Sequence, residues 1–165
     1  YAHVFPNLLV EGYGEALTAA DEALAIFQEL LDKRWEARVL WAVSVTHALK
    51  DDYEEALATS SAAQAIFEEL QDGRGIAATL LVAADMHIEN KAFEHGVQAA
   101  EEAQSICERV GYKKGQAASL QRQAIAFLEM QDFDKSEKVA SEALNLCRKI
   151  NDKKGEAYLL RLMGQ

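Results

Sequence analysis

Hydrophobic and small residues recur every three or four positions along this chain, which is the spacing of one face of an α-helix. In one segment they occupy Tyr53, Ala56, Leu57, Ser60, Ala63, Phe67 and Leu70. Glutamates fill many of the positions between them, so one side of this helix is apolar and the other is charged. Asp51 and Asp52 precede Tyr53, and Asp132 precedes Phe133. We expect these aspartates to cap the free N–H groups of the helices that follow.

The same pattern returns with a fixed period along the chain. The aromatic residues Tyr13, Tyr53, Phe93 and Phe133 are spaced by 40 residues each time. Seven further columns hold similar residues at the same step, and they start at Ala16, Ala20, Ala23, Ile26, Phe27, Ala37 and Leu40. Self-similarity at a fixed period of this length is the sequence signature of a repeat protein.

Each repeat contains two helical patterns, which we call the first and the second helix. The first helix is predicted to begin near Ala37, Ala77 and Ala117, and the second near the aromatic residue. The stretch VLWAVSV at 39–45 resembles a buried strand by itself, but the repeat assigns it to a first helix. Proline occurs once and glycine nine times, which favours long helices. We predict an all-α fold, a right-handed α-solenoid of stacked antiparallel helix pairs.

The repeat register also divides the chain. We expect a single repeat domain over 1–165, with units at approximately 1–32 (partial), 33–72, 73–112, 113–152 and 153–165 (partial). A solenoid needs polar capping repeats at its ends, and neither end of this sequence has the pattern of one. The sequence therefore predicts a fragment of a longer array.

Several columns match a known motif. Leucine recurs at Leu40, Leu80, Leu120 and Leu160, and a small residue follows four positions later at Ser44, Ala84, Ala124 and Gly164. With the turn aromatics and the alanine columns, the whole chain resembles the tetratricopeptide repeat family. Its forty-residue length is similar to the repeats of cell-polarity adaptors and kinesin light chains, although the usual proline after the second helix is missing. The resemblance implies that the first helices line a concave groove in which a peptide lies.

The resemblance also implies which side chains face that groove, namely those one step round from the motif stripe. These positions hold Phe5, Leu9, Arg38, Trp41, Val45, Leu49, Leu81, Asp85, Gln121, Arg122, Tyr158 and Arg161. The groove would be apolar around Trp41 and polar to basic around Arg122. Tryptophan and arginine are frequent hot spots of protein interfaces, so Trp41 is the main candidate for partner contact. The alternative is that Trp41 packs within the helical array.

The best-known ligand site of the family is a clamp for a chaperone's C-terminal carboxylates. The resemblance would require Lys and Asn in place of Trp41 and Val45, Asn in place of Val82, and Lys and Arg at Ala118 and Arg122. Only Arg122 matches, so we expect no such clamp. A partner with an apolar or amphipathic segment fits these residues better.

Charge and composition narrow the range of partners. The 165 residues carry a net charge of −10, and residues 1–80 hold 5 Lys/Arg against 14 Asp/Glu, a balance of −9. An acidic protein repels phosphate backbones, so we expect no nucleic-acid partner. No apolar run is long enough to span a membrane, and the N-terminus lacks the pattern of a signal peptide. We expect no membrane contact and a cytoplasmic location.

The histidines and cysteines are candidates for metal-binding or nucleophilic sites. His47 and His87 are forty residues apart, and two histidines on adjacent helices could bind a metal. No third ligand stands at helical spacing beside them, so we favour a packed structural role. Cys107 and Cys147 occupy the apolar column of Phe27, which predicts buried core thiols and not nucleophiles or a zinc site.

A column of basic residues also keeps the forty-residue step, at Arg34, Arg74, Lys114 and Lys154. We expect these side chains to follow the end of a second helix, where positive charge interacts favourably with the helix dipole. The alternative is an edge that binds anions.

The sequence contains no Gly-rich phosphate loop, no HExxH and no GxSxG motif.

These features predict a protein–protein interaction module, a scaffold or adaptor that binds a peptide or amphipathic helix in its groove. We expect no enzymatic activity, no cofactor and no metal. One alternative is a regulatory or sensor domain whose groove is filled by a segment of the same chain or by a homodimeric partner. A second is a non-catalytic accessory domain of a larger enzyme. Fold alone does not decide among them.

Overall fold

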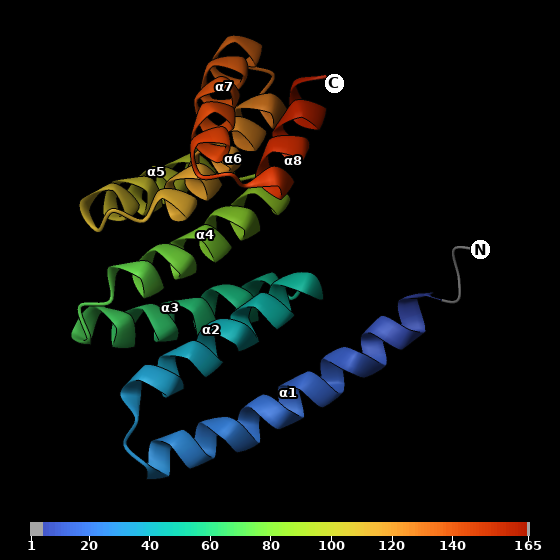
Figure 1. Ribbon diagram of the computed structural model, residues 1–165. Coiled ribbons are helices and arrows are strands. Elements are labelled where there is room, and N and C mark those ends of the chain that lie inside the picture. The colour runs from blue at the N-terminus through green and yellow to red at the C-terminus, as the bar shows by residue number, and fades with distance from the viewer. Residues whose placement is uncertain (1–4, 165) are drawn as a thin grey trace. The chain divides into compact units, whose positions relative to one another are not determined.

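The computed structural model describes the backbone of residues 5–164 and the side chains of residues 12–164, and every regular element in that range is an α-helix (Figure 1). The elements are α1 (Phe5–Glu29), α2 (Lys33–Leu49), α3 (Tyr53–Glu69), α4 (Gly73–Glu89), α5 (Phe93–Arg109), α6 (Lys113–Glu129), α7 (Phe133–Lys149) and α8 (Lys153–Met163). The predicted all-α fold of antiparallel helix pairs is confirmed for this part of the chain.

The first helices begin four residues earlier than the hydrophobic pattern indicated. The starts expected near Ala37, Ala77 and Ala117 lie inside α2, α4 and α6, one turn after their first residues. Aspartate caps explain part of the difference. The Asp32 carboxylate accepts a hydrogen bond from the Trp35 amide. Asp72 before α4 and Asp152 before α8 likewise accept hydrogen bonds from backbone amides in the first turns of these helices.

A residue with positive φ forms every turn between helices that the structure describes. The φ angles are 55° at Leu31, 61° at Asp51, 53° at Gln71, 59° at Lys91, 68° at Gly111, 61° at Gln131 and 58° at Asn151. A left-handed residue ends a helix and reverses the chain within two or three residues. Only glycine adopts this conformation without steric cost, so six of these turns depend on helix packing to hold them.

Helix α1 differs from the expected first partial repeat. The repeat register predicted that a second helix begins near Tyr13. The structure has one continuous helix from Phe5 to Glu29. Gly12 stands where Asp52 and Asp132 precede later second helices, so it has no side chain that could cap a new helix. A continuous helix satisfies these backbone groups without the cost of a turn.

The chain divides into two compact units, residues 1–71 and residues 72–165. In the first unit, α2 packs against both α1 and α3. Its contact side is made of small residues, and Ala37 and Ser44 of α2 and Ala56 and Ala63 of α3 are buried. Small side chains let helix backbones approach closely, which explains why the repeat conserves their spacing within this one chain.

In the second unit each helix packs against the next from α4 to α8, and the first helices α4, α6 and α8 also touch in sequence. Cys107 and Cys147 are fully buried free thiols in two neighbouring core clusters, so their predicted core role is confirmed. Gly115 and Gly155 lie directly over these sulfur atoms, and an added Cβ at either glycine would collide with the thiol. The glycines therefore allow the next first helix to approach.

One motif leucine does not lie where the pattern placed it. Leu80 and Leu120 are buried, but Leu160 is 49% exposed and its neighbour Leu159 is completely buried. Leu80 and Leu120 pack against the second helix of their own repeat. No helix follows α8 within the described residues, so Leu160 has nothing comparable to pack against.

Candidate functional site

The residues predicted to face a groove fall into two sets, one in each compact unit. We call Arg38, Trp41, Val45 and Leu49 the α2 stripe. We call Leu81, Asp85, Gln121, Arg122, Tyr158 and Arg161 the α4–α6–α8 face. The remaining two predicted residues, Phe5 and Leu9, lie outside the side chains that the structure describes.

The α2 stripe forms one row along its helix because its members are three or four positions apart. Trp41 is 37% exposed and Leu49 is 62% exposed, whereas Val45 between them is partly buried. Within residues 12–164, the Trp41 indole makes no ring contact with another aromatic or cationic side chain. Among the described residues, Trp41 thus presents a partly exposed ring on which no other ring or cation stacks.

Arg38, the remaining member of the stripe, is directed toward a second tryptophan. Its guanidinium lies 4.9 Å from the centre of the Trp35 ring. Trp35 also stacks on Phe27 of α1, with ring centroids 5.6 Å apart and planes at 14°. Sequence reasoning missed this cluster because Trp35 precedes the predicted start of the first helix. The cluster ties α1 to α2 and leaves Trp41 apart from it.

Asp85 and Arg122 form the strongest polar contact of the α4–α6–α8 face. The Arg122 Nε and Nη2 atoms donate to the two carboxylate oxygens of Asp85, both at 3.0 Å. This paired geometry is the most favourable one for arginine and a carboxylate. It joins α4 to α6, so any carboxylate of a partner would have to displace Asp85. Leu81, one turn before Asp85, packs against a core cluster and is only partly exposed.

Gln121 and Tyr158 line a common cavity of about 310 Å³ between α6 and α8. Its lining also includes Lys114, Lys154 and the Cys147 thiol. Neither lysine enters a salt bridge within residues 12–164. The cavity can therefore take an apolar side chain, and its lining carries two lysines against one carboxylate residue, Asp152.

Arg161, the last predicted residue, stacks over the Tyr158 ring at 5.2 Å from its centre.

Burial raises the pKa of the Cys147 thiol above its ordinary value, and the carboxylates of Asp152 and Glu156 raise it further. The thiol is therefore protonated and unreactive at neutral pH.

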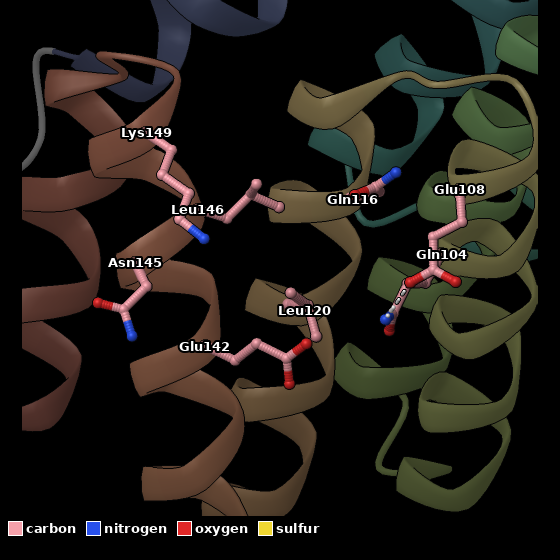
Figure 2. A pocket seen from close by; sticks show the side chains of 8 residues that line it. All are labelled: Gln104, Glu108, Gln116, Leu120, Glu142, Asn145, Leu146 and Lys149. Carbon is pink, nitrogen blue, oxygen red and sulfur yellow. Dashed lines mark hydrogen bonds between the residues drawn. The ribbon is translucent and has the colours of Figure 1, made fainter.

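A second cavity lies on the other side of this unit, where sequence reasoning placed no site. It has a volume of about 270 Å³ and is lined by Gln104, Glu108, Gln116, Leu120, Glu142, Asn145, Leu146 and Lys149 (Figure 2). Figure 2 shows Gln104 and Glu108 of α5 on one side of the cavity, and Glu142, Asn145 and Lys149 of α7 on the other. Gln116 and Leu120 come from α6 between them.

Two buried glutamines organise the wall of this second cavity. Gln123 donates to Gln104 at 2.8 Å, and Gln104 donates to Glu108 at 2.9 Å. Gln116 donates to the backbone carbonyl of Cys107 at 3.2 Å. These bonds satisfy the glutamines internally and connect α6 to α5, which gives them a structural role.

The histidines take part in local contacts within the helix hairpins. His47 lies 3.4 Å from the Asp52 carboxylate, and Lys50 lies 2.6 Å from the same group. The hydrogen bonds from Lys50 and then from His47 hold the pKa of Asp52 below its ordinary value. Asp52 was expected to cap α3, but its side chain makes no capping bond because these two residues engage it.

His87 faces His95 across the next hairpin, with ring centroids 5.5 Å apart. Burial, and then repulsion by a protonated His95, lowers the pKa of His87. Within the described residues, no group of three or more histidine, cysteine, aspartate or glutamate side chains is arranged to hold a metal ion.

The basic column lies at a different place from the one predicted. Arg34, Arg74, Lys114 and Lys154 lie in the first turns of α2, α4, α6 and α8, at the positive end of the helix dipole. The early helix starts explain the error. Local contacts offset the unfavourable location in part: the Arg74 guanidinium lies 5.0 Å from the centre of the Tyr112 ring.

The helix pairs and their repeated contacts define the class of the protein as a helical-repeat, α-solenoid type. No protein-family model matches the chain, and no curated protein sequence matches it. No helix among the described residues is both long and apolar enough to cross a membrane.

Proposed function

We propose that this chain is a protein-interaction module of the tetratricopeptide-repeat type, which binds a peptide or an amphipathic helix of another protein. The observation that carries the proposal is the α2 stripe, where Trp41 and Leu49 remain exposed on one helix face. Tryptophan is frequent among interface hot spots, and covering Trp41 and Leu49 would remove apolar area from water.

The α4–α6–α8 face supports the same function with different chemistry. The cavity beside Gln121 and Tyr158 has room for one apolar side chain, and Lys114 and Lys154 favour an acidic neighbour in the partner. Arg122 is a weaker candidate than the sequence indicated, because Asp85 already occupies its guanidinium. In the second unit, the main contact of a bound segment would therefore be this cavity and not Arg122.

The first experiment selects peptides that bind the protein from a displayed library of extended and helical sequences, and measures their affinities by calorimetry. Trp41→Ala should weaken binding at least about tenfold, the loss expected for a hot-spot residue. Trp35→Ala is the matched control, since it removes the other tryptophan of α2 from the Phe27 cluster. We expect it to change affinity by less than about twofold.

Fluorescence offers a direct test of the same contact. The chain contains two tryptophans, so a Trp35→Phe variant has Trp41 as its single indole. Its emission should shift to shorter wavelength when a selected peptide binds, because the ring leaves water. If peptides bind tightly while the emission and the Trp41→Ala affinity stay unchanged, the α2 stripe is not the binding site.

Two other functions remain as alternatives to be tested. A regulatory domain with a filled groove would bury Trp41 in the isolated protein, and iodide would then quench its fluorescence poorly. An accessory domain of a larger enzyme would bind a segment of that enzyme instead of a separate adaptor partner. We place the protein in the cytoplasm, as a scaffold or adaptor that needs no cofactor.

A further inference from the structure

The helix hairpin formed by α4 and α5 brings two histidines together. The imidazole rings of His87 on α4 and His95 on α5 lie with their centroids 5.5 Å apart and their planes tilted by 40°. His87 is partly buried and His95 is exposed, so an ion can reach the pair from solvent. The two side chains line neither of the cavities described above.

The geometry of the hairpin produces this contact. At the forty-residue step the same two positions hold Phe127 and Lys135, and the Lys135 ammonium lies 5.4 Å from the centre of the Phe127 ring. Gly96 follows His95 directly, and a Cβ at Gly96 would collide with the Ile88 side chain of α4. The glycine therefore lets α5 approach α4 closely at this point. The repeat places these two positions side by side, and in the α4–α5 hairpin both carry an imidazole.

The ring nitrogens of this pair have no other partner. Within the described residues they make no hydrogen bond and no salt bridge, whereas the His47 ring in the α2–α3 hairpin lies 3.4 Å from the Asp52 carboxylate. Burial, and then repulsion by His95, lowers the pKa of His87, which favours its neutral ring. Neutral imidazole is the form that ligates metal ions, through the lone pair of a ring nitrogen.

The separation of the two rings fits a single ion between them. Bonds from zinc to imidazole nitrogen are about 2.0–2.1 Å long, so two imidazoles on one tetrahedral zinc ion have ring centres roughly 5 Å apart. The observed separation of 5.5 Å differs from that value by a small side-chain adjustment. Imidazole is a preferred ligand of zinc, copper and nickel ions, whereas magnesium prefers oxygen. The net charge of −10 also attracts cations to the chain.

We propose that His87 and His95 bind one Zn²⁺ ion across the α4–α5 hairpin, with water molecules at the remaining positions of the ion. Sequence reasoning paired His87 with His47 and expected no metal, because the contact with His95 arises from the hairpin and not from the repeat period. Two protein ligands make a weaker site than the three or four of zinc enzymes and zinc fingers. The ion therefore adds to the stability of the hairpin and is not a requirement of the fold. The site does not use Trp41, so it is independent of the function proposed above.

The first test titrates Zn²⁺ into the purified chain, prepared without a histidine tag, by isothermal calorimetry. His87→Gln and His95→Gln should each weaken zinc binding at least about tenfold, since loss of even an outer partner of a zinc ligand has an effect of that size. His47→Gln is the matched control, because His47 is the counterpart of His87 forty residues earlier and is engaged by Asp52. It should leave the affinity for zinc unchanged. Neither histidine of the pair is fully buried, so the variants should keep the helix content of the wild type in circular dichroism.

Cobalt reports the coordination of the ion directly. The visible absorption of Co²⁺ becomes much stronger when the ion passes from six water ligands to a tetrahedral site. The wild-type chain should show this stronger absorption, and His87→Gln and His95→Gln should each lose it. Zn²⁺ should displace the cobalt and remove the absorption, whereas Mg²⁺ should not, because magnesium prefers oxygen ligands.

Thermal unfolding gives a third measurement. Zinc should raise the unfolding midpoint of the wild type and of His47→Gln, because it binds the folded pair of rings and not the unfolded chain. The midpoints of His87→Gln and His95→Gln should not respond to zinc. A wild-type chain that binds no zinc would overturn the proposal. Zinc binding that survives the loss of either histidine would also overturn it, because the ion would then be held by surface carboxylates.

Discussion

Residues 1–71 and residues 72–165 use the same helix pair but hold their first helices differently. In the first unit the exposed row of α2 contains Trp41 and Leu49, with no salt bridge from that row to another helix within the described residues. In the second unit Asp85 and Arg122 join α4 to α6 through two hydrogen bonds. One repeat sequence can thus support a surface open to a partner and a surface fastened by its own side chains.

Charge separates the two units further. Residues 1–71 contain 4 Lys/Arg against 13 Asp/Glu, a balance of −9, and residues 72–165 contain 13 against 14, a balance of −1. The excess negative charge of the first unit lies on α1 and α3, since the side chains described there include no lysine or arginine. Salt should therefore stabilise the first unit more than the second, because it screens repulsion among like charges.

The largest expected effect lies in the core of the second unit. Leu159→Ala should lower the free energy of unfolding by about 2–5 kcal/mol, because Leu159 is completely buried. Leu160→Ala, at the adjacent half-exposed leucine, should cost less than about 1 kcal/mol. Urea unfolding followed by circular dichroism measures both. Equal losses would mean that Leu160 is also covered in solution.

Loss of the Asp85–Arg122 contact should have the next largest effect on the free energy of unfolding. Arg122→Ala should cost about 1 kcal/mol, since the pair is well aligned but partly open to water. Asp85→Ala should cost a similar amount, and the double variant should cost little more than either single one. If the two losses simply add, then the hydrogen bonds do not couple the helices, and Arg122 becomes available again as a partner contact.

Two aspartates that precede helices, Asp52 and Asp72, differ in whether they cap the helix. Asp72→Ala should cost about 1 kcal/mol, because the Asp72 carboxylate accepts the amides of Arg74 and Gly75 at 3.1 Å. Asp52→Asn serves as a comparison in the first unit, where the carboxylate engages Lys50 and makes no capping bond. We expect the midpoint of thermal unfolding to change less in Asp52→Asn than in Asp72→Ala.

The smallest effect concerns pH. The pKa of His87 is lower in the folded state than its ordinary value near 6.5. The unfolded chain therefore binds this proton more readily, and folding stability falls as pH drops below 6.5 through the folded pKa. His95→Gln should reduce this loss by removing the second charge, and His87→Gln should remove it. The urea midpoints of the wild type and both variants, measured at neutral and mildly acidic pH, test this order of pH effects.

Much of the fold could be predicted because its information is local and repeated. The forty-residue step fixes which residues share a helix face, and the burial of Ala56, Cys107 and Cys147 agrees with it. The predicted starts of the first helices were less accurate, because a hydrophobic pattern reports the buried face and not the polar first turn. The basic column was misplaced for that reason, since Arg74 begins a helix and does not follow one.

The predicted site depended less on local pattern. The register separated Trp41 from the motif stripe, and its side chain is 37% exposed. The register could not show that Arg122 is engaged by a residue 37 positions away. It also missed Trp35, whose role arises from stacking on a different helix. Side-chain pairing between helices depends on their relative rotation and spacing, which no periodicity specifies.

The amino-acid sequence alone determined the helical class, the period and the small residues that allow helices to approach, because each of these follows from chemistry within one helix. Only the tertiary structure decided that α1 runs unbroken past Tyr13, that Asp85 engages Arg122 and that Leu160 remains exposed. These outcomes depend on which neighbouring helix is present to cover a side chain. Repeated residues are equivalent in sequence, but their burial depends on the helices beside them.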